Sequence, residues 1–325
     1  VTYREDKYAP VIPILAEPLT FMLLVPADKS LQLVGFIKKK YEMEMAKVRD
    51  RLPIKLGVVY AGRRMPIRSI LDAGRAMLSN TFSLEIWQVK ENGLQSKSEE
   101  TTVSTKKKIL LERDKRTFSW CLPMQMGDKM TDDYWYPYLF LASKEKGGST
   151  VTRREAKAVL PLGQGQEKGC MVVHAADLNP GERVYLWPST FDFEFLDTNA
   201  RRFELYYNKE GRRPRGTKPF YLEDIDRFAV LWDEYLQHLS RTQCKQLVAT
   251  IEDIREQWFG QDHEGLSLSD EVFSRFVADV LAGAFWPQEK QWNSIPEHWR
   301  EELVQAGVRG ELTDLLELHL EILKE

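Results

Sequence analysis

The first eighty positions alternate between runs of apolar residues and amphipathic stretches. Residues 11–15 and 20–25 are two apolar runs separated by a short turn. A strand that is apolar at nearly every position is usually buried on both faces, so we expect two buried strands here. From 29 to 50, apolar residues recur every three or four positions, which predicts a helix. Residues 54–60 predict a third buried strand, and 67–78 predict a second, shorter helix.

The predicted order is strand–strand–helix–strand–helix. This is the order in the second half of a ferredoxin-like or palm domain whose first strand and helix are missing. A sheet built from these strands alone would expose an apolar edge, which proteins cover or pair. We therefore expect the missing elements either upstream in the same polypeptide or on another chain. The chain opens on Val1 rather than methionine, and we expect it to be a segment of a longer polypeptide.

The pattern changes after position 80 to short alternating runs interrupted by glycine, proline and charged residues. Four runs predict strands, namely 82–87, 109–111, 170–173 and 183–187. The polar stretch 91–108 is predicted to be mostly loop.

From position 222 the pattern is helical. Residues 241–258 carry apolar side chains on one face, and Ser269 is a suitable N-cap for the next helix. Residues 294–297 match a capping box that opens a helix ending at Gly307, and 311–323 form the last helix. We therefore expect an α+β fold. Its parts are a partial ferredoxin-like palm domain over 1–80, a β-rich insertion over 81–220 and a helical bundle over 221–325.

Composition narrows the functional classes. The net charge of −3 over 325 residues gives no global attraction to nucleic acid, so such contacts need local patches. The three cysteines, Cys121, Cys170 and Cys244, form no C-x-x-C pair, which favours a reduced, intracellular protein without a zinc site. No apolar run approaches the length of a membrane span, and we expect a cytoplasmic protein.

Common catalytic motifs are absent from the sequence. It contains no G-x-x-x-x-G-K-[ST] and no G-x-S-x-G, and its five histidines are scattered. The glycines from Gly163 to Gly169 precede a strand rather than a helix, so we interpret them as a hairpin loop and not a phosphate loop. We expect no cofactor.

One acidic group is a candidate metal site. Asp128, Asp132 and Asp133 could hold Mg²⁺ through their carboxylates. No further ligands stand at a fixed spacing, and turns use the same residue types, so we favour a structural role for all three.

One basic stretch is a stronger candidate. Between 201 and 218 the local net charge is +5, and aromatic residues are interleaved with the cations, a combination that suits phosphate neutralisation and base stacking. The candidate RNA-binding residues there are Arg201, Arg202, Phe203, Tyr206, Tyr207, Arg212, Arg213 and Arg215. Arg63, Arg64 and Arg68 form a smaller patch. A solvated hairpin with ion pairs remains an equal alternative for 201–218. For 38–40 we expect lysines paired with Glu42 and Glu44 at helical spacing.

Several of these segments resemble a known family. Residues 21–29, 51–59 and 71–75 resemble the second palm domain of the large subunit of type III CRISPR effector complexes. Residues 188–197, together with Arg201, Arg202 and Phe203, resemble the subtype III-D branch. The resemblance runs along most of the chain and is specific in the palm and around 188–213. In the helical tail it rests on order and length.

The resemblance bears on catalysis. In active family members the palm hairpin carries a Gly-Gly-Asp-Asp turn, whose carboxylates hold the metals that join ATP into cyclic oligoadenylate. That turn aligns with Glu17, Pro18, Leu19 and Thr20, so neither aspartate is present here. Two-metal catalysis needs those carboxylates. We therefore expect a non-catalytic protein. The alternative is an active nucleotidyl cyclase whose metal is held by non-standard acids such as the three aspartates above.

The resemblance also implies an architecture and partners. The subunit would cap the effector complex near the 5′ tag of the guide RNA, and its palm would face the target RNA. Its helical tail would pack on smaller subunits, and the remainder of the large subunit would supply the missing half of the palm. The expected partners are thus guide RNA, target RNA and other subunits, with no membrane. A general RNA-binding protein outside CRISPR is a further alternative, which the incomplete palm disfavours.

Overall fold

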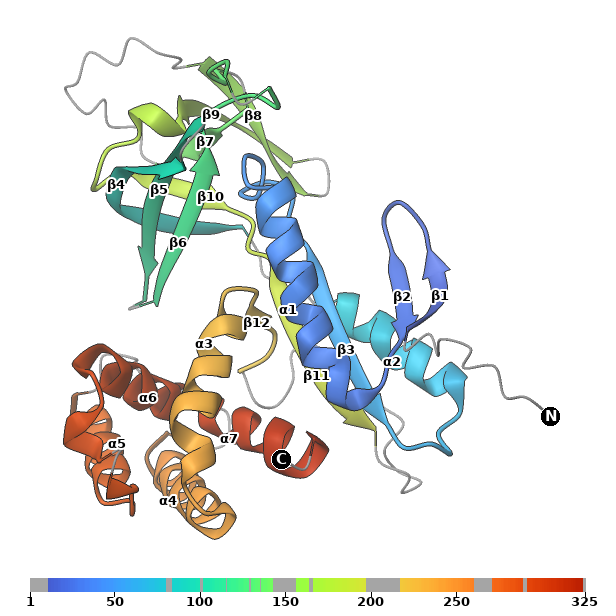
Figure 1. Ribbon diagram of the computed structural model, residues 1–325, viewed down its shortest axis with the longest axis vertical. Coiled ribbons are helices and arrows are strands. Elements are labelled where there is room, and N and C mark those ends of the chain that lie inside the picture. The colour runs from blue at the N-terminus through green and yellow to red at the C-terminus, as the bar shows by residue number, and fades with distance from the viewer. Residues whose placement is uncertain are drawn as a thin grey trace.

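The computed structural model describes residues 11–79, 84–99, 102–114, 116–128, 130–134, 136–142, 156–163, 166–196, 217–259, 271–288 and 291–323. Sheets occupy the first two thirds of the chain and helices gather toward the C-terminus, which confirms the predicted α+β class (Figure 1). Throughout these residues, no helix has both the length and the hydropathy that a membrane crossing requires.

The N-terminal elements follow the predicted order. They are β1 (Ile12–Ala16), β2 (Phe21–Leu24), α1 (Ala27–Glu44), β3 (Lys55–Ala61) and α2 (Ile67–Ser79). β1 and β2 form an antiparallel hairpin in which Ile12 lies opposite Leu24 and Ala16 lies opposite Phe21. The change from an apolar run to a three- and four-residue period therefore predicted the order of these elements. The helix predicted over 29–50 is shorter than expected, because α1 ends at Glu44.

The lysines of α1 form the predicted ion pairs. Lys38 Nζ lies 3.0 Å from Glu42 Oε1, and Lys40 Nζ lies 2.6 Å from Glu44 Oε1. Lys38 is buried and also donates to Asp226 Oδ2 at 2.6 Å, which ties α1 to the helical region.

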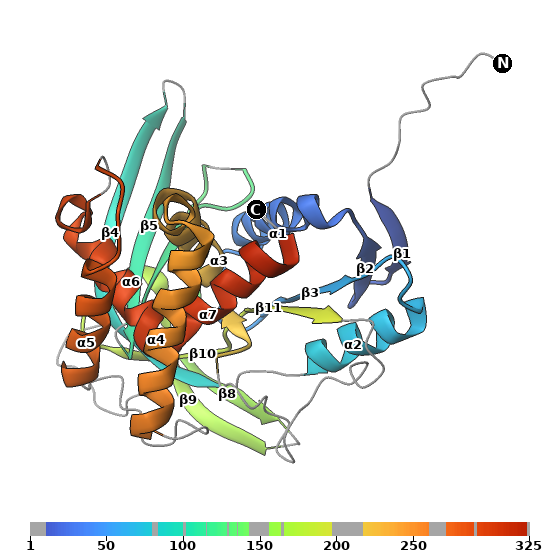
Figure 2. The ribbon, with the colours of Figure 1, turned by 90° about the horizontal axis from the view of Figure 1, so that it is seen from below.

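β3 pairs with a strand from much later in the sequence. β11 (Thr190–Leu196) runs parallel to β3, and β12 (Phe220–Tyr221) pairs antiparallel with β11 on its other edge. The two N-terminal helices cover opposite faces of this small sheet (Figure 2). Tyr60 of β3 contacts Ser30 of α1, whereas Gly57 of β3 faces Met77 of α2. β11 and β12, and not the hairpin, thus extend the sheet that contains β3.

A second, larger sheet occupies the middle of the chain. Within the described residues it has seven strands in the order β6-β5-β4-β10-β7-β9-β8, and its neighbours are antiparallel. The strands are β4 (Glu85–Glu99), β5 (Thr102–Arg113), β6 (Arg116–Pro123), β7 (Tyr138–Leu141), β8 (Ala156–Gly163), β9 (Gln166–His174) and β10 (Arg183–Leu186). β8 and β9 pair as far as Gly163 opposite Gln166, so the predicted hairpin at these glycines is confirmed.

The prediction of a loop over 91–108 is wrong. β4 and β5 pair across this stretch, up to Glu99 opposite Thr102. Figure 2 shows the ends of these strands projecting from the body as a ribbon. A projecting ribbon is held by its backbone ladder and needs no apolar face, so its side chains gave no strand signal.

The C-terminal region is helical, as predicted. It comprises α3 (Asp224–Val230), a π-helical segment (Leu231–Tyr235), α4 (Arg241–Phe259), α5 (Glu271–Ala282), α6 (Glu297–Arg309), α7 (Glu311–Leu316) and a second π-helical segment (Glu317–Leu323). Cys244, Leu247 and Ile251 form the buried face of α4, which confirms the predicted amphipathic face of that helix. The predicted N-cap Ser269 lies outside the described residues.

Two predicted helix boundaries are wrong. Pro296 occupies the N-cap of α6 and no side chain caps that end, so the predicted capping box does not form. The helix also continues past Gly307 to Gly310, which has a φ of 82°. Gly307 is instead a packing position, because a Cβ atom there would lie 2.5 Å from Val277 Cγ1. Gly310 ends the helix because glycine adopts a left-handed conformation at little cost.

A continuous apolar core joins the small sheet to the helical region. It includes Val34 of α1, Leu56 of β3, Phe193 of β11, Trp232 and Phe273. Tyr221, beside this core, packs against the core of the large sheet. The three parts of the chain are therefore packed together around β11 and β12.

Candidate functional site

The hairpin turn at residues 17–20 lacks the groups that metal catalysis needs. Glu17 N donates to Thr20 O at 2.9 Å, and Thr20 N donates to Glu17 O at 3.3 Å, which closes a tight turn. Leu19 is 97% exposed at this turn. Glu17 is the sole carboxylate of the four residues, so the turn offers no pair of acids to clamp two metals.

The hairpin is less buried than its sequence predicts. Ile12 is 54% exposed, Ile14 42%, Phe21 43% and Leu24 47%, so the expectation of two strands buried on both faces is wrong for the described part of the chain. The physical reason is topological. Among the described residues β2 pairs with β1 alone, so nothing extends the hairpin into a larger sheet that would cover its side chains.

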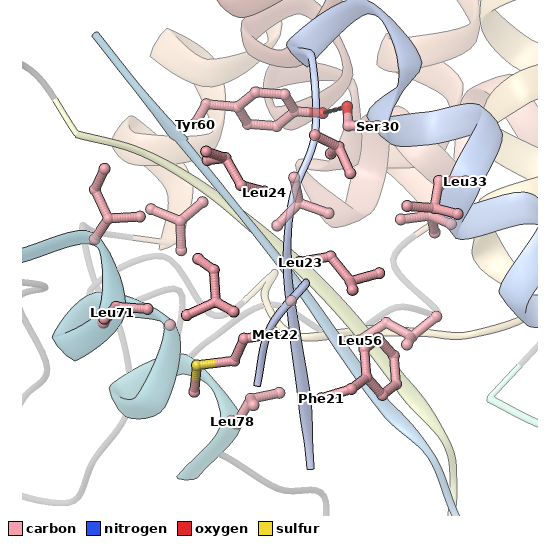
Figure 3. A pocket seen from close by; sticks show the side chains of 18 of the residues that line it. Phe21, Met22, Leu23, Leu24, Ser30, Leu33, Leu56, Tyr60, Leu71 and Leu78 are labelled. Carbon is pink, nitrogen blue, oxygen red and sulfur yellow. Dashed lines mark hydrogen bonds between the residues drawn. The ribbon is translucent and has the colours of Figure 1, made fainter. Parts of the chain in front are cut away.

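A large apolar cleft lies between the hairpin and β3. Its volume is about 700 Å³, and side chains from four elements converge on it (Figure 3). β2 forms one wall and β3 the facing wall. α1 contributes Leu33 and Ile37, and α2 contributes Leu71 and Leu78. The cleft is thus lined by side chains of the N-terminal strands and helices.

Three polar side chains at the cleft, those of Ser30, Tyr60 and Lys55, are engaged within the protein. Ser30 Oγ lies 2.7 Å from Tyr60 Oη and donates to Ala27 O at 2.7 Å. Lys55 Nζ donates to Leu78 O at 3.1 Å, and burial lowers the pKa of this lysine. The cleft therefore presents apolar side chains and strand backbone to an occupant, and sequence patterns gave no sign of it beyond the apolar runs themselves.

The three candidate aspartates do not converge on a metal site. Asp128 is exposed and accepts hydrogen bonds from Thr131 Oγ1 at 2.5 Å and from Met130 N at 3.0 Å, and these bonds lower its pKa. Asp132 lies 3.4 Å from Tyr134 Oη. Asp133 is buried and accepts from Lys47 Nζ at 2.6 Å. Over the described part of the chain, no three His, Cys, Asp or Glu side chains are grouped so that they could hold a metal.

The basic candidates divide into two groups. Arg63, Arg64 and Arg68 are exposed between β3 and the first turn of α2, and Arg68 Nε lies 3.7 Å from Asp72 Oδ2. Candidates Arg201, Arg202, Phe203, Tyr206, Tyr207, Arg212, Arg213 and Arg215 lie outside the described residues. Lys218, at the end of the basic stretch, is a partly buried residue whose side chain is 8% exposed. Its Nζ lies 3.7 Å from the ring centroid of Phe193 and 3.6 Å from Asp314 Oδ1.

Sequence reasoning missed a buried ionic cluster where the large sheet meets the helices. Arg227 Nη2 lies 2.6 Å from Glu311 Oε2 and 2.9 Å from Asp224 Oδ1. Arg116 of β6 adds a bond of 2.6 Å to Asp224 and a second bond to Glu311. The two arginines hold the pKa of Asp224 below its usual value despite its burial. Because Arg116 and Glu311 are each more than 80 residues from the Asp224–Arg227 pair, no local motif could reveal this cluster.

Asp50, in the loop before β3, is an ionisable group that destabilises the fold when charged. Burial raises its pKa to about 7, and Arg51 Nη1 at 2.9 Å offsets this in part. A folded pKa above the unfolded value means that the native state binds more protons, so stability falls as pH rises from about 4 to about 7.

Asp50→Asn should therefore raise the free energy of unfolding at pH 8 by about 1–2 kcal/mol and leave it unchanged near pH 4. The amide keeps an acceptor for Arg51 and removes the buried charge. Urea unfolding at both pH values measures the effect, with the exposed Asp72→Asn as control. A variant that is less stable than the parent at pH 8 would contradict the argument.

Comparison with known proteins adds no identification. No family model matches the chain, and the comparisons with curated proteins and with solved structures found no match.

Proposed function

We propose that the chain is a non-catalytic scaffold and RNA-contacting segment of the large subunit of a cytoplasmic type III-D CRISPR effector complex. The observation that carries the proposal is the arrangement of the N-terminal elements. A hairpin, a crossing helix and a strand stand in palm order around an apolar cleft, and the hairpin turn has one carboxylate where a cyclase needs a pair. Its partners are guide RNA, target RNA, other subunits and the rest of the large subunit.

The state of the acidic residues favours a non-catalytic role. Leu19 and Thr20 replace the two metal-binding aspartates of the resemblance, and neither side chain can clamp a divalent ion. The alternative acids are committed elsewhere, since Asp128 closes its own turn and Asp133 pairs with Lys47. A cyclase built on those aspartates therefore has no support in their geometry.

The packing of the chain suits a scaffold. The core runs from α1 through β3 and β11 into the helical region, and the ionic cluster around Arg227 ties the large sheet to the same helices. A body of this kind holds exposed surfaces at fixed positions. The hairpin, which pairs with no third strand among the described residues, and the exposed arginines between β3 and the first turn of α2 are two such surfaces.

RNA contact is assigned to the basic stretch that ends at Lys218. Its net charge of +5 stands out in a chain whose total is −3, so it supplies the local field that the whole protein lacks. The interleaved aromatic residues add stacking surfaces for bases. Arg63, Arg64 and Arg68 extend the cationic surface on the palm-like part.

Reversing three charges in this stretch tests the RNA contact. The triple variant Arg212→Glu, Arg213→Glu, Arg215→Glu should bind single-stranded RNA on the order of 10- to 100-fold more weakly at moderate salt. Loss of about three phosphate contacts should also reduce the slope of log K against log salt by about 2. Fluorescence anisotropy with a short labelled RNA over a salt series measures both quantities.

The matched control reverses three exposed lysines elsewhere, Lys29→Glu, Lys40→Glu and Lys245→Glu, whose side chains are 57%, 57% and 54% exposed. It carries the same change in net charge and should bind RNA within a few-fold of the parent. Equal affinity of the arginine variant and the parent would remove RNA contact from this stretch.

A further inference from the structure

Two strand edges face the same cleft from opposite sides. β2 pairs with β1, and β3 pairs with β11, and within the described residues neither strand has a partner on its other edge. Every residue of β2 and every residue of β3 lines the cleft. Strand edges of this kind carry backbone donors and acceptors that proteins pair or cover.

The remaining walls of the cleft are helices. α1 connects β2 to β3 as a crossover, and both strands run in the same direction (Figure 1). α1 lines the cleft with Ala27, Ser30, Leu33, Val34 and Ile37, and α2 lines it from the opposite face of the sheet. Two strand edges and two helix faces therefore enclose a space in which a strand would continue the sheet from β2 to β3. Strand–helix–strand units with one strand inserted between their parallel strands are a known arrangement.

The chemistry of the walls disfavours a polar small molecule. Ligand pockets place a few convergent polar groups to orient their ligand. Here Ser30, Tyr60 and Lys55 are already bonded within the protein. What the walls offer is apolar side chains on two sides and strand backbone on the other two, which an extended chain with apolar residues on both faces would match.

We propose that this cleft is the docking site of an extended β-strand from a partner polypeptide segment, which bonds to β2 and β3 at once. The strand is about as long as β3, which has seven residues, and it runs antiparallel to both neighbours. It carries apolar side chains at nearly every position, because α1 covers one of its faces and α2 the other. Docking would also explain why Phe21 and Leu24 are exposed in the isolated chain. The inference deepens the proposed function and rests on it for the source of the strand, the missing half of the palm.

The experiment appends the strand to the full chain. A seven-residue segment of valine, isoleucine and threonine is fused to the N-terminus through a flexible Gly-Ser linker, which raises its effective concentration at the cleft. The control fusion carries proline at two central positions, which removes backbone donors while the segment stays apolar. Amide hydrogen exchange followed by mass spectrometry reports protection in each element.

The expected result is exchange about tenfold slower in β2 and β3 for the strand fusion than for the proline fusion, with no change in β6. Leu33→Asp, in the α1 wall, should abolish the difference. Phe36→Asp, on the same helix but 66% exposed and away from the cleft, should leave it intact. This experiment contains no RNA. A negative result would therefore contradict strand docking without contradicting the proposed RNA contact, which the anisotropy assay tests separately.

Three outcomes would overturn the inference. Equal exchange in both fusions would show either that the cleft binds an apolar segment without pairing to its backbone, or that it binds neither segment. Protection of β2 and β3 in the unfused chain that rises with protein concentration would assign the cleft to a second copy. Protection in the unfused chain that disappears when residues 1–10 are deleted would assign it to the chain's own N-terminal segment.

Discussion

Replacing Arg227 with methionine should lower the free energy of unfolding by about 3–5 kcal/mol. Arg227 lies between Glu311 and Asp224, whose side chains are 1% and 4% exposed. Methionine fills similar volume but leaves Arg116 alone to neutralise two buried carboxylates. An uncompensated buried charge is among the costliest defects that a single substitution can introduce.

Urea unfolding, followed by circular dichroism, measures this loss. The control is Arg68→Met, because the Arg68 side chain is 92% exposed and its pair with Asp72 is long. That variant should change stability by less than about 0.5 kcal/mol. If Arg227→Met lowered the free energy of unfolding no more than Arg68→Met does, the ionic cluster would not be an interaction that holds the large sheet to the helices.

Trp87→Ala should also lower the free energy of unfolding by about 3–5 kcal/mol. Trp87 is fully buried in β4, where its ring stacks on Phe118 with centroids 4.3 Å apart and meets the edge of Tyr221 at 5.7 Å. Its Nε1 donates to Glu85 Oε2 at 2.9 Å. Alanine would leave a cavity and would remove one of the contacts between the large sheet and Tyr221 of β12, so thermal and urea unfolding should both shift.

Ile86→Ala is the matched control for that cavity. Ile86 neighbours Trp87 on the same strand, points to the other face and is 42% exposed. Its truncation should cost about 1 kcal/mol or less, because little buried volume is lost. Comparable losses for both variants would mean that the face carrying Trp87 is not the packed face of this sheet.

The local pattern of the chain was sufficient to predict the order of its N-terminal strands and helices and its helical C-terminal region. Both consist of elements whose periodicity reflects burial, and β1 to α2 appear in the predicted order. Prediction failed where other forces decide the structure. The β4–β5 ribbon over 91–108 is held by backbone pairing, and Gly307 serves packing against Val277 rather than helix termination.

The candidate site was predictable only in part. The absence of a pair of carboxylates from residues 17–20 is visible in the sequence, because it depends on residue identity alone. The cleft could not be predicted from the sequence. It forms because β3 pairs with β11, a strand more than a hundred residues later in the chain, and the other edge of β3 then faces the hairpin. The burial expected for Phe21 and Leu24 also failed for this reason, since a strand buries its second face only when a neighbour covers it.

The central claim is that this chain is a non-catalytic part of an RNA-guided complex. The most direct test is to purify the tagged protein from its host. The RNA that co-purifies is then sequenced, and the proteins that co-purify are identified. We expect short RNAs that share one repeat-derived 5′ tag, together with several small subunits in fixed ratio. A monomer that purifies free of RNA and of other subunits would contradict the claim.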